Sequence, residues 1–243
     1  MSCVLEIQGL GKSYNGVNIL KDFDLKLIRG EVLSILGPSG CGKSTLLRLI
    51  AGLEQPEEGS ITVEAENGKT GKAFMIFQDF DQLFPWKTVL GNVTYPMGIR
   101  KIYDSDRGRN EAALEMLEMV EYRDSISKYP HQLSGGMKQK VALARALCLN
   151  PDLLLMDEPF ASLDAQTRNS MQELLLRIWK RKGLTILFVT HDIYEALAIS
   201  DRILVMGNKG EGIKTRMELE GAKPRNYGSP ELMKLWKEIY ELL

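Results

Sequence analysis

The chain has 243 residues, of which 44% are hydrophobic and 26% are charged, so its composition is that of an ordinary globular protein. Its 31 Lys and Arg residues balance 32 Asp and Glu residues, and the formal net charge of −1 gives no basic footprint for nucleic acid. Three cysteines without paired spacing are typical of a reducing compartment. The start lacks the pattern of a secretory signal, and the apolar runs are strand-sized, whereas a bilayer span needs about 18 apolar residues.

Short β-rich segments alternate with helical patterns along the chain, which predicts an α/β fold with a mostly parallel sheet. Strands are expected at residues 4–7, 25–28, 32–36, 61–63, 74–77, 153–157, 186–190 and 203–206. Helices are expected at residues 44–50 and 137–147, and helical spacing of apolar residues predicts others around 113–120, 171–178 and 230–239. The segment from Gln82 to Leu133 lacks a strand pattern. We therefore expect a core of residues 1–81 and 141–243 with a helical lobe, residues 82–140, inserted into it.

The sharpest motif follows the expected strand at residues 32–36. It reads Gly37, Pro38, Ser39, Gly40, Cys41, Gly42, Lys43, Ser44 and Thr45, and it fits G-x-x-x-x-G-K-[ST]. Glycines let backbone N–H groups turn inward around phosphate oxygens, and the start of the following helix adds positive charge. We expect Lys43 to reach the β- and γ-phosphates and Ser44 to coordinate Mg²⁺. Cys41 could be a redox-sensitive thiol, but a small residue tolerated in the loop is the favoured interpretation.

Two carboxylates end the expected strand at residues 153–157. Because successive side chains on a strand point in opposite directions, Asp157 and Glu158 can serve different partners at the carboxyl edge of the sheet. Asp157 is expected to hold Mg²⁺ through water, and Glu158 to polarise the attacking water as general base. Two solvated carboxylates are the alternative, which the phosphate loop makes unfavourable.

His191, one of two histidines in the chain, directly follows the expected buried strand at residues 186–190. A lone histidine is usually structural, but this one follows a third core strand and is expected to contact the γ-phosphate and organise the water at Glu158. The other, His131, is expected to make a local structural contact.

The segment from Leu133 to Gln139 adds a family resemblance. Ser134, Gly135 and Gly136 at the start of a helix form an anion-binding cap, and after a phosphate loop and before an acid pair they resemble the signature of ATP-binding-cassette proteins. The resemblance covers nearly the whole chain and implies a P-loop NTPase (RecA-like) core with an N-terminal antiparallel β subdomain. Many cassettes have Gln after Ser-Gly-Gly, whereas this chain has Met137 at that position and Gln139 nearby.

The resemblance also implies roles for single residues. Tyr14 matches the aromatic residue that stacks on adenine, and Gln78 matches the glutamine that touches Mg²⁺ and the attacking water. Asp164 matches a loop that crosses a dimer interface, and His191 matches the switch histidine. In such proteins two copies pack head to tail, so Ser134 of one copy would cap the ATP held by the other.

A subclass is suggested by the segment that follows Gln78. Pro85-Trp86-Lys87-Thr88-Val89 looks like the Pro-Trp-x-Thr-Val segment of importers for nitrate, sulfonates and taurine. Its apolar side chains could fill the core of the helical lobe or line a groove that receives a helix of a membrane subunit. These are Phe80, Leu83, Phe84 and Trp86.

The resemblance thus implies an ATPase subunit, bound at the cytoplasmic face of the membrane, that powers an importer with separate permease subunits and a solute-binding protein. An exporter subunit and a soluble cassette acting on ribosomes or DNA are the alternatives. Neither a second phosphate loop nor a sustained heptad pattern supports the soluble cassette. The transported solute cannot be read from these residues.

Overall fold

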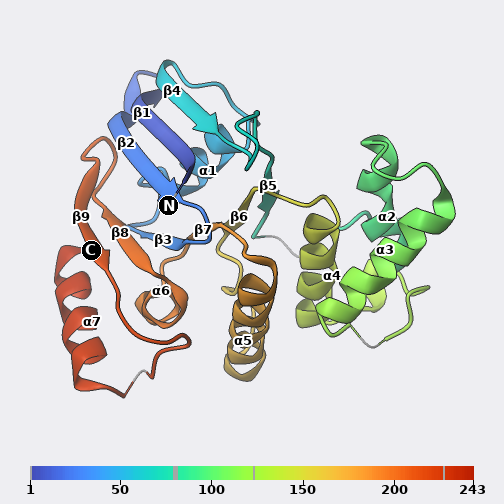
Figure 1. Cartoon of the computed structure of the whole chain (residues 1–243). Coiled ribbons are helices and arrows are strands. Elements are labelled where there is room, and N and C mark those ends of the chain that lie inside the picture. The colour runs from blue at the N-terminus through green and yellow to red at the C-terminus, as the bar shows by residue number, and fades with distance from the viewer. Residues whose placement is uncertain (1, 79–81, 123, 227) are drawn as a thin grey trace.

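The computed structural model describes residues 2–78, 82–122, 124–226 and 228–243. Its described strands form two sheets, one of three strands in the order β2-β1-β4 and one of six in the order β5-β6-β7-β3-β8-β9 (Figure 1). The smaller sheet is antiparallel, and in the larger sheet only the pair β8 and β9 is antiparallel. The strands are β1 (Cys3–Tyr14), β2 (Val17–Ile28), β3 (Val32–Leu36), β4 (Glu58–Val63), β5 (Ala73–Ile76), β6 (Leu153–Asp157), β7 (Ile186–Val189), β8 (Arg202–Met206) and β9 (Ile213–Glu218).

Helices cover the larger sheet and extend the molecule to one side (Figure 1). They are α1 (Lys43–Ile50), α2 (Val89–Ile99), α3 (Asp106–Met119), α4 (Gly135–Leu147), α5 (Ala165–Lys182), α6 (Ile193–Ile199) and α7 (Pro230–Leu242), with a 3-10 turn at Pro130–Gln132. No helix of the described residues is long and apolar enough to span a membrane.

The central strands are buried on both faces, which explains their continuous apolar sequences. Alternate side chains enter two different cores. Leu154, Met156 and Phe188 face a core shared with α4 and α5, and Leu155 and Val189 face a core shared with α1 and the antiparallel sheet. The predicted mixed α/β fold with a mostly parallel sheet is confirmed.

Three strands, β1, β2 and β9, differ from what the sequence pattern predicts. Strands β1 and β2 are each twelve residues long, whereas the pattern predicts only residues 4–7 and 25–28. Register shifts along their pairing interrupt the alternation of apolar residues, so the pattern reveals only their regular ends. Strand β9 is missed because charged residues alternate along this edge strand.

Helices α2, α3 and α4 share one continuous apolar core with the larger sheet. The predicted boundary between residues 140 and 141 falls inside α4. The division into a core and a separate lobe stays a prediction.

A buried asparagine fixes the loop between β5 and α2. Asn92 accepts a hydrogen bond from the Phe84 backbone N–H at 2.7 Å, and its Nδ2 donates to carbonyls of Phe84, Lys87 and Thr88 at 3.1 Å. Its side chain is completely buried, so these backbone groups have a protein partner in place of water. The loop that carries Trp86 is therefore held rigidly by α2.

We predict that Asn92→Ala lowers the free energy of unfolding by about 2–4 kcal/mol, because it leaves several buried backbone groups without a partner. Urea unfolding measures the change. The control is Asn110→Ala on the exposed face of α3, where a change within about 0.5 kcal/mol is expected. Equal stabilities of the two variants would contradict this role of Asn92.

Candidate active site

The phosphate loop joins the end of β3 to α1. Gly42, the residue before α1, has a φ of 113°, and a Cβ built there would lie 2.7 Å from Cγ2 of Ile19, so only glycine fits. Among the α-helices of the described chain, α1 alone begins without a side-chain cap. Its first N–H groups thus have no side-chain acceptor, which suits an anionic ligand.

Lys43 lies inside the curve of this loop. Its side chain is buried, and Nζ donates to the carbonyls of Gly37 at 2.7 Å and Pro38 at 2.9 Å. No ion pair joins Lys43 to a carboxylate within the described residues. A buried ammonium with only neutral acceptors gains strongly from a nearby anion, as a phosphate would provide.

Ser44 and Asp157 bring two oxygen atoms together beside the loop. The Ser44 hydroxyl donates to Oδ1 of Asp157 at 3.0 Å, and burial raises the pKa of that carboxyl. The described residues contain no cluster of three or more His, Cys, Asp and Glu side chains that could hold a metal ion. One hydroxyl and one carboxylate fit Mg²⁺, which takes few protein ligands and completes its shell with phosphate oxygens and water.

Two predicted residues, Gln78 and His191, converge on one carboxylate oxygen of a third, Glu158. Oε2 of Glu158 lies 2.9 Å from Nδ1 of His191 and accepts a hydrogen bond from Nε2 of Gln78 at 3.4 Å. The three residues follow β6, β7 and β5, which are neighbours in the sheet and end at the same edge. Glu158 has a φ of 44°, an unusual value for a residue with a side chain, and such strain is common at functional sites.

Tyr14 lies at the end of β1, and its ring is 41% exposed. Its hydroxyl hydrogen-bonds to Glu54, which raises the pKa of Tyr14, and Thr45 of the phosphate loop also contacts this hydroxyl. The Nζ atom of Lys12 lies 5.4 Å from the ring centre. An exposed ring beside the phosphate loop is available for stacking with a flat base.

The signature residues lie elsewhere. The Ser134 hydroxyl caps α4 by accepting from the Met137 N–H at 3.3 Å, and a Cβ at Gly136 would lie 2.8 Å from Cγ2 of Thr167 on α5. Ser134 and Gly136 line a pocket of about 560 Å³ between α4 and α5, to which no residue of the phosphate loop contributes. Asp164 caps α5 nearby, accepting from the Thr167 N–H at 3.0 Å.

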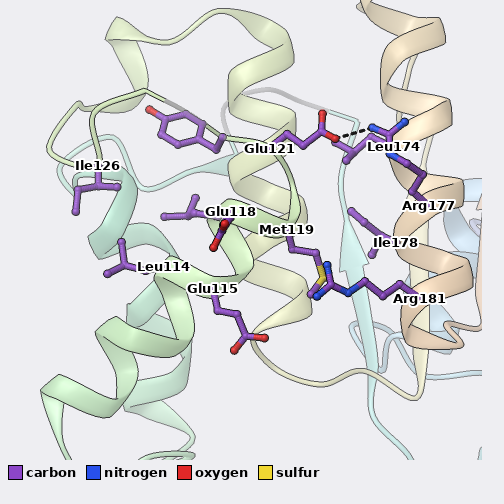
Figure 2. Close-up of a pocket in the computed structure, with 12 residues that line it drawn as sticks. Leu114, Glu115, Glu118, Met119, Glu121, Ile126, Leu174, Arg177, Ile178 and Arg181 are labelled. Atoms are coloured by element: carbon purple, nitrogen blue, oxygen red, sulfur yellow. Dashed lines mark hydrogen bonds and ion pairs between the residues drawn. The ribbon is translucent and has the colours of Figure 1, made fainter.

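A larger groove of about 740 Å³ lies between α3 and α5 (Figure 2). Acidic residues of α3 such as Glu115 lie opposite Arg181 of α5, and an ion pair of 2.8 Å joins Glu121 to Arg177. None of the predicted site residues lines this groove. It is a junction between the helices and is separate from the phosphate loop.

One polar network was not predicted. Arg168 of α5 donates to Asp192 and lies near Glu195 of α6, and the Glu195 carboxylate accepts from the Thr190 hydroxyl. In the sequence Arg168 and Glu195 look like ordinary surface charges of two helices. Only the packing of α5 against the segment after β7 reveals that they meet.

Comparisons with known proteins identify the family of the chain. Residues 20–161 match the ABC transporter family model. An aliphatic sulfonates import ATP-binding protein, SsuB 1 of Rhodococcus jostii, is 45% identical over 96% of this chain and 90% of its own length. An uncharacterized ABC transporter ATP-binding protein of Methanocaldococcus jannaschii is 40% identical over 100% of this chain and 92% of its own length.

Solved structures of cassettes are similar as well. The dimeric cassette MJ0796, in a post-hydrolysis state bound to ADP and Pi, superposes with a TM-score of 0.76 at 34% identity, over 90% of this chain and 100% of that chain. The cbiO1 protein of Clostridium perfringens, part of the ABC transporter complex cbiONQ, gives a TM-score of 0.78 at 29% identity, covering 90% and 89% of the two chains. The chain therefore belongs to the ABC transporter family and is one of its ATP-hydrolysing cassettes.

Proposed function

We propose that this ATPase is the energy-supplying subunit of a multi-subunit importer for a small solute of the nitrate, sulfonate or taurine kind. The importer assignment is supported by the Pro85-Trp86 segment and by the name of the SsuB relative. The observation that carries the catalytic part is the convergence of Gln78 and His191 on the Glu158 carboxylate.

The proposed reaction is attack of water on the γ-phosphorus of ATP, which releases ADP and phosphate. Lys43 and the N–H groups of residues 37–45 bind the phosphates, and Tyr14 stacks on adenine. Glu158 accepts the proton of the attacking water, while His191 and Gln78 hold the carboxylate and the water in position. Mg²⁺, held by Ser44, Asp157 and Gln78, would neutralise charge on the phosphates.

A second copy would complete the site. Ser134 and Gly136 line a pocket to which no residue of the phosphate loop contributes, so a single chain would leave the γ-phosphate open on one side. In a head-to-tail dimer the signature residues of each copy would cap the ATP of the other, with Asp164 at the interface. ATP would then hold the copies together, and its hydrolysis would release them.

We predict that Glu158→Gln still binds ATP but lowers kcat at least about 100-fold, since it removes the proton acceptor and keeps the shape of the side chain. The variant should accumulate as an ATP-bound dimer. Phosphate release and size-exclusion chromatography with ATP measure the two effects. Undiminished hydrolysis would remove Glu158 from the role of general base.

The membrane partner would bind the aromatic surface of Phe84, Trp86 and Tyr95. The Trp86 side chain is 70% exposed, and the Phe84 ring lies 5.7 Å from Trp86 and 5.0 Å from Tyr95. Leu83 is instead buried in the core, and Phe80 lies outside the described residues. An exposed aromatic cluster on a rigid loop suits a short helix of a permease. The chain would thus lie at the cytoplasmic face of the membrane, in a system that includes a solute-binding protein.

We predict that Trp86→Ala keeps ATP binding but weakens capture of the permease about 10-fold or more, because an exposed aromatic anchor is lost. The chain is co-expressed with a tagged candidate permease subunit and purified through that tag. Tyr240→Ala, which removes an exposed aromatic side chain on α7, is the control and should be captured normally. Equal capture of both variants would refute the proposed surface.

A further inference from the structure

The guanidinium of Arg168 contacts two loops that are far apart in the sequence. Nη2 donates to the carbonyl of Leu163 at 3.2 Å, and Nη1 donates to Oδ2 of Asp192 at 3.2 Å. Its Nε lies 3.6 Å from Oε1 of Glu195. Leu163 belongs to the loop before α5 that ends at Asp164, and the two carboxylates follow His191.

The carboxylates hold the backbone on both sides of His191. Oε2 of Glu195 accepts from the Thr190 hydroxyl at 2.7 Å, and the same hydroxyl accepts from the Asp192 N–H at 3.0 Å. Asp192 also caps α6 by accepting from the Tyr194 N–H at 2.8 Å. His191 thus lies between two residues that these hydrogen bonds hold in place, and its ring contacts Glu158.

The buried carboxylate of Glu195 makes this network depend on the positive charge of Arg168. The side chain is only 3% exposed, and burial raises its pKa to about 7. The charged groups that act on it are Arg168 and His191, which favour the carboxylate, and Asp192, which opposes it. A buried carboxylate needs a positive partner close by, and Arg168 supplies it.

We propose that Arg168 is a positioning residue that couples the loop ending at Asp164 to the orientation of His191. This inference rests on the proposed two-copy function, in which Asp164 lies at the interface. A planar guanidinium has donors in a fixed fork, so a shift of the Leu163 carbonyl redirects its contacts with Asp192 and Glu195. His191 already contacts Glu158 in the single chain, and docking of the second copy would change the orientation of that ring through Arg168. Within the described residues, Arg168 makes no hydrogen bond or ion pair with the phosphate loop or with Glu158.

The test compares Arg168→Gln and Arg168→Lys with a control on the same helix, Arg177→Gln, which removes an exposed arginine. Arg168→Gln should lower kcat about 10-fold or more while KM for ATP stays within about three-fold, and Arg168→Lys should be intermediate. The control should keep the kcat of the natural chain. An unchanged kcat in Arg168→Gln would overturn the inference.

A double variant separates positioning from simple charge balance. Glu195→Gln added to Arg168→Gln removes the buried charge that needs Arg168, so the thermal midpoint should recover while kcat stays low. Recovery of both quantities would overturn the positioning role. Glu158→Gln is assayed alongside. If it hydrolyses ATP normally, the proposed function fails, whereas an inactive Glu158→Gln beside a fully active Arg168→Gln removes only the further inference.

Discussion

The parallel pairing of β3, β6 and β7 is the constraint on which the site depends. Because neighbouring parallel strands end at one edge of the sheet, Lys43, Asp157 and His191 arrive together although they are far apart in the sequence. Full burial of the strands on both faces fixes that register, since a shift of one residue would exchange their two cores. The chemistry is therefore positioned by the same packing that stabilises the sheet.

The proposed catalytic residues and the signature residues lie in two separate regions of the chain. The edge of the sheet supplies a buried lysine, a buried aspartate and a strained glutamate, the groups that we propose bind and orient a triphosphate. The signature residues line a different pocket, against α5. The loop of residues 161–164 contacts Arg168, and Arg168 contacts Asp192 next to His191. A second copy bound at this loop could therefore influence His191.

Residues with local patterns were predicted well from the sequence. The phosphate loop and the buried central strands depend on neighbours in the chain, and the structure contains both. The irregular hairpin of β1 and β2, the charged edge strand β9 and the contacts of Arg168 depend on distant partners. Side-chain roles such as that of Tyr14 stay predictions, because they concern a ligand and a second copy.

The central claim is that Lys43 of one copy and Ser134 of another enclose the same ATP. A direct measurement mixes Lys43→Ala with Ser134→Glu, in which the new carboxylate would repel the triphosphate, and follows ATP hydrolysis. Each variant alone should be inactive, but every mixed dimer contains one intact site, so an equal mixture should regain about a quarter of the natural activity. If the mixture stays as inactive as its components, or if Ser134→Glu alone hydrolyses ATP at full rate, the two-chain site is contradicted.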